Sequence, residues 1–488
     1  AHGSTLVLGE GSADASAYPT SLSPGAQRVG RTCPAGWHSG AMDDQDRTET
    51  IIEVLGEAFA DLMEADPAAF RGKYRKMAAD PHSFYRGTAC LFYADVTGST
   101  GGSAGSQVWS EDFADERSGR IWIHGDLHVE NFGTYLNSDG RFVFDVNDFD
   151  EAYLGRFTWD LQRFAASLAL VGWQKALPEQ EVRELVERYL RAYLDQVDRY
   201  ADGAGDGDYA LYLHNTSGPV HEVLLQAREQ RRTDLLAANT TRGDQGHRTF
   251  RDDASVRRLD DDERERVVQA YRDYLETIPD ERRSPRDVFY ELHDVVGKSG
   301  FGIGSAGLPA YNLLIEGQSQ ALDNDVVLSM KQANVPAVSR FVDTSEVDDY
   351  FDHEGHRTAV SQRALQVHTD PLLGHAAIDG VGYVVSEVSP YELDLEWSGI
   401  TEPDEMGEVV ELLGRATAKV HCASDEDSDQ DLVDFQVEEA VVASVGERRD
   451  ELVSWVTDFA TTYADRVRAD HALFVEAFRE GRIGISST

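Results

Sequence analysis

A short β-hairpin near residue 140 constrains the fold of this chain more than any other feature. Two β-rich runs, 132–136 (FGTYL) and 141–146 (RFVFDV), are separated by residues 137–140, whose Asn-Ser-Asp-Gly sequence is typical of a tight turn. Another strand-like run, 121–123, precedes them. Because a hairpin returns the chain beside its own start, we expect the residues after the second run to meet those before the first.

The segments at the open end of this hairpin are rich in side-chain oxygens. Residues 124–131 read HGDLHVEN, and residues 145–152 read DVNDFDEA. Carboxylate and amide oxygens without thiolates suit Mg²⁺ or Mn²⁺ and favour phosphate chemistry. The pattern predicts one cleft that gathers Asp126, Asn131, Asp145, Asp148 and Asp150.

These residues can be given roles in phosphate transfer. In this interpretation Asp126 is the base that orients or deprotonates a hydroxyl acceptor. Asn131 and Asp148 hold metal ions that bridge nucleotide phosphates, and Asp145 is a further candidate metal ligand. The alternative interpretation is that Asp126 and Asn131 only satisfy loop amides, as Asp and Asn often do in turns.

Two histidines, His124 and His128, flank Asp126 and leave a second chemistry open. Imidazole and carboxylate together could form the ligand set of a metal-dependent hydrolase. Otherwise His124 organises the loop by bonding backbone groups, and His128 does the same or touches the substrate.

A glycine-rich segment and a lysine-bearing strand form the second candidate region. Residues 300–317 read GFGIGSAGLPAYNLLIEG, and glycines let backbone amides approach phosphates closely, although such a loop can also be a plain hairpin turn. Lys331 is one of only six lysines and lies on an apolar strand, where phosphate binding is a natural reason to retain it. The predicted nucleotide-binding residues are Gly302, Gly304, Ser305, Gly307 and Lys331.

The rest of the chain alternates between helical and strand-like periods without an internal repeat. Helical patterns cover 158–174, 178–199, 262–277, 354–368, 403–421 and 433–480, and alternating patterns cover 293–304, 309–316, 325–331 and 381–388. We expect a flexible tail at 1–45, a helical large lobe at 46–290, a small β-rich nucleotide lobe at 291–395, and a helical return to the large lobe at 396–488.

The charge of the chain limits its partners. With 45 Lys and Arg against 88 Asp and Glu, the net charge of −43 repels nucleic acids and anionic membranes. Abundant carboxylates with so few lysines are typical of salt-adapted proteins, so we expect a halophilic, cytoplasmic protein. No run approaches the length that spans a bilayer, and three scattered cysteines predict neither a disulfide framework nor a zinc ribbon.

The sequence HGDLHVEN resembles the catalytic loop of aminoglycoside phosphotransferases and choline kinases, which belong to the protein-kinase-like superfamily. Asp148-Phe149-Asp150, followed by Gly155 and Trp159-Asp160-Leu161, is similar to their metal-binding segment and favours Asp148 over Asp145 as the metal ligand. The resemblance implies an enzyme that uses ATP and Mg²⁺ to phosphorylate a hydroxyl acceptor.

Four motifs in order, PHSFYRGTA, GDLHVENFG, FDVNDFDEA and GIGSAGLPAYNLL, resemble an uncharacterised kinase-like family, domain-of-unknown-function family 2252, over about residues 70–425. The glycine segment and Lys331 resemble the small lobe of a kinase, yet they follow the catalytic loop instead of preceding it. The resemblance therefore implies a two-lobed, kinase-like α+β fold that is circularly permuted.

Departures from the kinase pattern leave other functions open. The helix at 354–368 should carry a glutamate that pairs with Lys331, and Glu354 at its start is the only local candidate. The alternatives are a silent nucleotide-binding or regulatory protein and an adenylyl transferase on the same fold. Arg86 and Glu387 are candidates for supporting roles, the first near an anionic substrate, the second in the segment 383–393 that could link the lobes.

Overall fold

The fold is a mixed α+β arrangement in which helices surround several small antiparallel sheets. The computed structural model describes residues 44–99, 113–205, 209–243, 246–298, 308–345, 347, 349–366, 368–426, 428 and 431–483. All of them belong to one compact unit. The predicted tail at 1–45 lies outside the described residues up to residue 43, and the first helix begins at Asp44.

The helices are α1 (Asp44–Ala65), α2 (Pro67–Met77), α3 (Pro81–Arg86), α4 (Ala89–Val96), α5 (Phe157–Gln174), α6 (Glu179–Ala201), α7 (Gly218–Glu229), α8 (Arg232–Asn239), α9 (Asp261–Leu275), α10 (Glu354–Gln366), α11 (Pro403–Cys422), α12 (Val437–Val445) and α13 (Arg449–Arg479). The strands are β1 (Ile121–Ile123), β2 (Phe132–Leu136), β3 (Phe142–Val146), β4 (Tyr153–Gly155), β5 (Thr240–Arg242), β6 (Arg248–Phe250), β7 (Val256–Arg257), β8 (Leu292–Lys298), β9 (Ala310–Ile315), β10 (Val326–Gln332), β11 (Gly374–Ile378) and β12 (Val381–Glu387).

The predicted hairpin is confirmed. β2 and β3 pair antiparallel with Phe132 opposite Val146 and Leu136 opposite Phe142. A second antiparallel pair, β1 with β4, joins the strand before the HGDLHVEN loop to the strand after the DFDEA segment. The two pairs together bring the loop after β1 beside the loop after β3, as the turn chemistry predicted.

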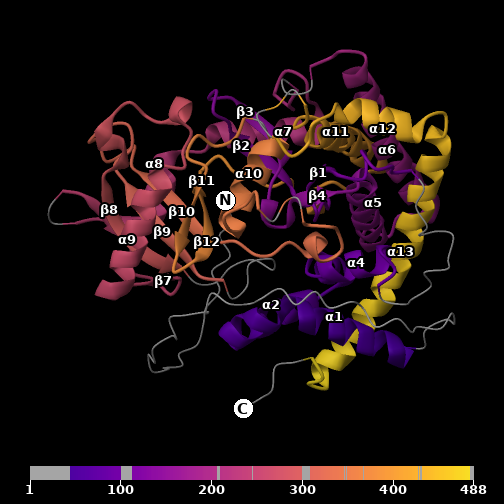
Figure 1. Cartoon of the computed structure of the whole chain (residues 1–488), viewed down its shortest axis with the longest axis horizontal. Helices are drawn as coiled ribbons and strands as arrows, with labels where there is room; N and C mark the ends of the chain where they lie inside the picture. Colours follow the sequence, from indigo (N-terminus) through magenta and orange to yellow (C-terminus); the bar gives the residue numbers. More distant parts are fainter. Residues whose placement is uncertain are drawn as a thin grey trace. The chain divides into compact units, whose positions relative to one another are not determined.

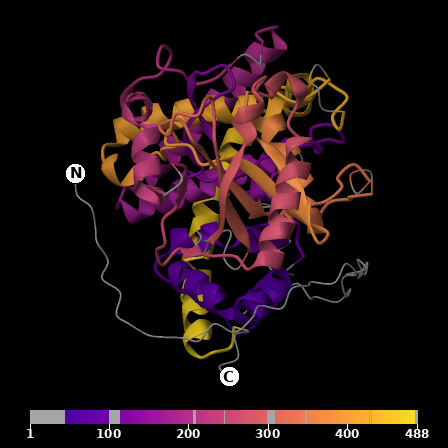
Figure 2. The ribbon, with the colours of Figure 1, turned by 90° about the vertical axis from the view of Figure 1, so that its left-hand side faces the viewer.

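The six-stranded antiparallel sheet has the order β11-β12-β10-β9-β8-β7. Figures 1 and 2 show α9 lying beside its strands. Side chains alternate between the faces of a strand, so Leu328 and Met330 of β10 join the hydrophobic cluster that includes Tyr274 of α9. Val327 points to the opposite face, into a cluster with Phe250, and Lys331 shares the face of Val327.

The largest hydrophobic cluster is built mainly from α5, α6, α11 and α13, which pack together in Figure 1. α6 and α11 approach closely at Gly414, where a Cβ atom would lie 2.3 Å from the backbone oxygen of Tyr189. Any side chain at Gly414 would force these helices apart, which explains the glycine inside a long helix.

Three parts of the chain differ from the pattern read in the sequence. The single helix expected over 433–480 is interrupted at Gly446, whose φ of 56° and ψ of −134° no helix accommodates, so α12 and α13 are separate. The mixed region before β1 holds α2, α3 and α4. The Arg-rich stretch near 228–258 holds α8 and the short strands β5, β6 and β7. Among the described residues, no helix combines the length and apolar character needed to cross a bilayer.

Candidate active site

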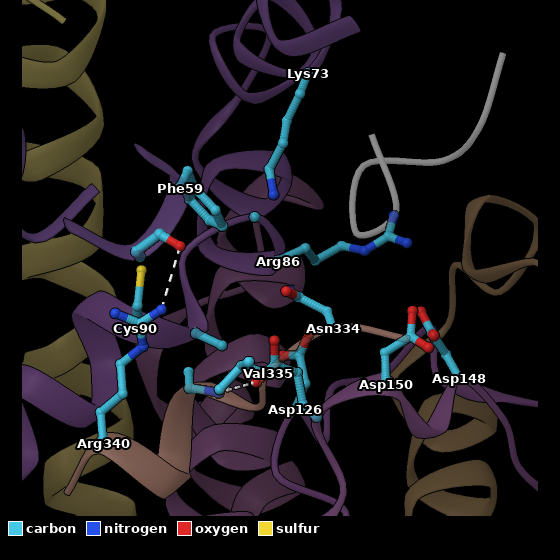
Figure 3. Close-up of a pocket in the computed structure, with 15 residues that line it drawn as sticks. Phe59, Lys73, Arg86, Cys90, Asp126, Asp148, Asp150, Asn334, Val335 and Arg340 are labelled. Atoms are coloured by element: carbon cyan, nitrogen blue, oxygen red, sulfur yellow. Dashed lines mark hydrogen bonds between the residues drawn. The ribbon is translucent and has the colours of Figure 1, made fainter. Parts of the chain in front are cut away.

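A cavity lies where the loops after β1 and β3 meet the N-terminal helices and the end of the six-stranded sheet (Figure 3). We call it the acidic cavity, because four neighbouring carboxylates line it. Its walls include Lys73, Arg86, Cys90, Asp126, Asp148, Asp150, Glu151, Asn334 and Arg340.

The loop after β1 is held by Asp160 near the start of α5. One carboxylate oxygen of Asp160 accepts the backbone N–H of His124 at 2.6 Å, and the other accepts that of Gly125 at 3.0 Å. Gly125 has a φ of 78°, and a Cβ atom there would lie 2.1 Å from the carbonyl oxygen of Glu151. Only glycine therefore allows the loop after β1 to touch the loop after β3.

Both ring nitrogens of His124 are used by backbone groups. Its Nδ1 accepts the backbone N–H of Asp126 at 3.3 Å, so Nε2 carries the proton and donates to the carbonyl of Asn147 at 2.7 Å. His128 is buried, and burial lowers its pKa well below the usual value. Its Nδ1 accepts the backbone N–H of Glu130 at 3.3 Å. These contacts fit loop-organising histidines better than the metal ligands of a hydrolase.

Asp126 is held from one side by Arg163 of α5. Nε of the fully buried Arg163 donates to Oδ1 of Asp126 at 2.6 Å, and Nη2 lies 2.5 Å from the same oxygen. Arg163 also donates through Nη2 to the carbonyl of Tyr85, which fixes the guanidinium itself. Both contacts use Oδ1, so they orient the Asp126 carboxylate at the wall of the acidic cavity and leave Oδ2 without a contact from Arg163.

Asp148 and Asp150 place two carboxylates beside the lysine of β10. Lys331 Nζ donates to Oδ2 of Asp150 at 2.5 Å, across 181 residues of sequence. Burial alone would lower the pKa of Lys331, but Asp150 and Asp148 raise it above the usual value, so the side chain is cationic. Loss of hydration in the cavity, and then the Asp150 carboxylate, raise the pKa of Asp148.

The backbone at Asp148 is left-handed, with a φ of 58° and a ψ of 75°. Aspartate tolerates this region better than most residues, yet the conformation is strained and places the carboxylate at the cavity instead of continuing β3. An observed outlier of this kind at a charged cavity is consistent with a functional constraint.

Glu151 is a cavity residue that the sequence patterns did not single out. Its Oε2 accepts the backbone N–H of Ala337 at 2.5 Å. Burial, with the charges of Asp126 and Asp150, raises the pKa of Glu151 to about 7, although Ala337 and Arg357 oppose the shift. Glu151 can therefore exchange a proton near neutral pH.

Arg357 of α10 ties the acidic loop, residues 147–152, to the segment after β10. Its guanidinium donates to the carbonyls of Ala152 at 2.8 Å, Asp150 at 2.9 Å and Asn334 at 2.8 Å. Its Nε donates to Glu354 at 2.7 Å. Glu354, the expected partner of Lys331, is thus paired with Arg357, and Asp150 is the acid that pairs with Lys331.

Cations from the N-terminal helices face the carboxylates across the acidic cavity, as Figure 3 shows for Lys73 and Arg86. The Lys73 Nζ lies 3.9 Å from the ring centroid of Phe59, and burial lowers the pKa of Lys73 to about 8. Arg86 forms an ion pair with Glu130. Burial raises the pKa of the Cys90 thiol to about 11, which disfavours the thiolate near neutral pH. Lys331 was selected as a site residue partly because the chain has only six lysines, and the same argument could have identified Lys73.

Several predicted site residues lie elsewhere. Asp145 is buried in an ion pair with Lys419 and accepts the backbone N–H of Val146 at 2.8 Å, so its carboxylate serves the core and does not line the acidic cavity. Glu387 pairs with Arg232. Asn131 also does not line the cavity. The glycine-loop residues Gly302, Gly304, Ser305 and Gly307 lie outside the described residues.

The donor set around Asp148 fits a divalent cation that prefers oxygen. Asn131 donates its Nδ2 to the carbonyl of Asp126 at 2.9 Å, which fixes the amide and leaves Oδ1 as its acceptor atom. The Asp150 carboxylate lies close enough to raise the pKa of Asp148, so the two carboxylates repel each other. A bound divalent cation would offset this repulsion more fully than Lys331 does alone. Mg²⁺ or Mn²⁺ is the expected ion, and Asp148 and Asp150 are the cavity residues that could hold it, whereas no contact among the described residues places Asn131 beside them.

Over residues 65–477 the chain matches the family described as "uncharacterized protein conserved in bacteria (DUF2252)". The match spans most of the chain, so the protein belongs to this family and the predicted resemblance to it is confirmed. No curated protein and no solved structure matches the chain. The kinship with kinases stays a prediction.

Proposed function

We propose that this member of the DUF2252 family is a phosphotransferase that moves the terminal phosphoryl group of ATP to a hydroxyl acceptor in the acidic cavity. The observation that carries the proposal is the meeting of Lys331 with Asp150 and Asp148 beside Asp126. A phosphate-binding cation, metal-binding carboxylates and a base are the three parts that phosphoryl transfer needs.

The order of elements in the sheet adds support. Lys331 lies on β10, the third strand counted from β8, and helix α10 follows it. In kinases the nucleotide-binding lysine also lies on the third strand, ahead of a helix. A two-lobed, kinase-like fold, with the small lobe at 291–395 placed after the catalytic loop by circular permutation, is therefore part of the proposal.

The chemistry assigns each residue one task. Asp126 accepts the proton of the acceptor hydroxyl through Oδ2 while Arg163 holds Oδ1. The acceptor oxygen then forms a bond to the γ-phosphorus as the bond between that phosphorus and the bridging oxygen breaks, and ADP leaves with the electron pair. Lys331 and Lys73 offset the charge of the phosphates. A divalent ion held by Asp148 would supply further charge neutralisation when bound.

The test uses the full chain with Mg²⁺ and ATP labelled separately at the γ and α positions. We expect label to pass from the γ position to acceptor or water, and we expect Asp148→Asn to lower this rate by at least about 100-fold. Asp139→Asn is the matched control, because Asp139 is an exposed carboxylate in the turn of the same hairpin. Transfer of the α label instead would contradict the proposal and identify an adenylyl transferase.

A silent nucleotide-binding protein is the second candidate. It is favoured by the pairing of Lys331 with Asp150 instead of a glutamate of α10. Binding of Mg²⁺ and ATP that is weakened in Lys331→Met, without transfer of either label, would establish this alternative. No binding of ATP in the presence of Mg²⁺ would refute both.

A further inference from the structure

A second cluster of metal-binding side chains lies at the edge of the six-stranded sheet, on strands that do not line the acidic cavity. His293 of β8, Glu316 just after β9 and His247 just before β6 each offer one ligand atom, and these atoms all lie within 4.8 Å of one another. His293 Nε2 is 2.7 Å from Oε2 of Glu316. The His247 and His293 rings are stacked, with centroids 4.8 Å apart.

A fourth potential ligand, Asp325, lies beside this cluster. β9 and β10 pair with Ile315 opposite Val326, so Asp325, directly before β10, lies opposite Glu316, directly after β9, at the same end of the sheet. Asp325 is 1% exposed, and neither of its carboxylate oxygens accepts a hydrogen bond from a described residue. Burying a carboxylate without hydrogen bonds lowers the stability of the folded protein, and a bound cation would offset this loss.

The nearest protein cation does not satisfy Asp325. Arg248 Nε lies 3.6 Å from Oδ2 of Asp325, beyond hydrogen-bond distance. Nε instead donates to the carbonyl of Leu322 at 2.7 Å, and Nη1 donates to Thr240 at 3.1 Å.

We propose that His247, His293, Glu316 and Asp325 form a binding site for a divalent transition-metal ion of the zinc type. Two imidazoles favour zinc over Mg²⁺ or Ca²⁺, and four protein ligands form the closed set of a structural site. Zinc bonds of about 2.0–2.2 Å place tetrahedral ligand atoms about 3.4 Å apart, so side-chain shifts of about 1 Å bring His247, His293 and Glu316 to bonding distance.

The ion would fasten the β5–β6 hairpin to the sheet. His247 belongs to the turn of this hairpin, where its carbonyl accepts the backbone N–H of Gly243 at 2.8 Å, whereas the other three ligands belong to β8 or border β9 and β10. Metal binding would replace the contact between His293 and Glu316 and compensate the charge of Asp325. The expected role is structural, and it does not depend on the function proposed for the acidic cavity.

The test is zinc binding to the full chain without a histidine tag, after chelator treatment, measured by calorimetry and by thermal unfolding. We expect one equivalent of zinc per chain and a higher unfolding temperature with zinc. His247→Ala removes an exposed ligand and should weaken binding by about 10–100-fold. His214→Ala, which removes another exposed histidine, is the matched control and should bind zinc as the wild type does.

Asp325→Asn gives an independent readout. It should weaken zinc binding by a similar factor while leaving the metal-free protein at least as stable as the wild type, because it removes a buried charge that accepts no hydrogen bond from a described residue. The proposal is overturned if the wild type binds no stoichiometric zinc, or if His247→Ala and His214→Ala bind zinc equally. It is also overturned if Asp148→Asn, and not His247→Ala, abolishes binding, which would assign the ion to the acidic cavity.

Discussion

Two lysine–aspartate pairs join the hairpin region to distant parts of the chain, and they differ in how much water reaches them. In the pair of Lys419 with Asp145, both side chains are 2% exposed. In the pair of Lys331 with Asp150, the side chains are 24% and 15% exposed. We call them the sealed pair and the open pair.

The comparison shows that a lysine–aspartate pair does not by itself identify a ligand-binding site. In the sealed pair, Lys419 also donates to the carbonyl of Leu365 at 2.7 Å, so its charge and hydrogen bonds are matched inside the protein. The open pair has an additional carboxylate, Asp148, and borders the acidic cavity. An excess of negative charge beside a cavity can bind a cation, whereas a matched pair in the core only holds segments together.

The largest effect is expected when the sealed pair is broken. Lys419→Met leaves the buried Asp145 carboxylate without its cation and should lower the free energy of unfolding by about 3–5 kcal/mol. Urea unfolding measures this loss. Lys419→Met combined with Asp145→Asn should recover most of it, and a double variant no more stable than the single one would contradict the assignment of a matched pair.

The equivalent change in the open pair should affect ligand binding more than folding. Lys331→Met should change the free energy of unfolding by about 1 kcal/mol or less, because the pair is partly hydrated. It should weaken the binding of ATP in the presence of Mg²⁺ by about 100-fold, which calorimetry measures. A loss of stability equal to that of Lys419→Met would remove the distinction between the two pairs.

The carboxylates around the open pair should leave a signature in the pH dependence of stability. The pKa of Glu151 rises from 4.5 to about 7 on folding, so its ionisation opposes folding as the pH rises through this range. Glu151→Gln keeps the oxygen that accepts the Ala337 N–H. It should stabilise the protein by about 1–2 kcal/mol above pH 7 and not below pH 4.5. A pH-independent difference in thermal unfolding would contradict this.

The smallest effect is expected from salt. Salt screens hydrated charges more than buried ones. Molar salt should therefore reduce the difference in free energy of unfolding between the wild type and Lys331→Met by about 0.5 kcal/mol. The corresponding difference between the wild type and Lys419→Met should not change. Urea unfolding at low and high salt makes the comparison. Equal salt dependence of the two differences would mean that both pairs are equally hydrated.

The parts of the fold that local chemistry determines were predictable. The β2–β3 hairpin follows from its turn residues, and the strands around Lys331 follow from alternating apolar residues. Helix α4 was not predictable from periodicity, because residues 89–95 are all buried and leave no polar face. The strands β5 to β7 are only two or three residues long, too short for a pattern to establish.

Some residues of the candidate site could likewise be predicted from local sequence, whereas others depend on tertiary packing. Asp126, Asp148 and Asp150 could be placed together because one hairpin connects their loops. Asp145 could not be distinguished from them, since only the packing of α11 shows that its carboxylate meets Lys419. Arg163 depends likewise on how α5 packs against the loop after β1, a tertiary contact that leaves no local signal.

The guanidinium of Arg357 ties together two parts of the wall of the acidic cavity. Its bonds to the carbonyls of Ala152, Asp150 and Asn334 join the acidic loop to the segment after β10. Separating the two would break either the one bond to Asn334 or the two bonds to the acidic loop, and each such bond is worth about 1.5–3 kcal/mol. These bonds, with the ion pair between Lys331 and Asp150, hold the two side chains beside each other. We expect ligand entry to require displacement of the opposite wall, formed by the helices that carry Lys73 and Arg86.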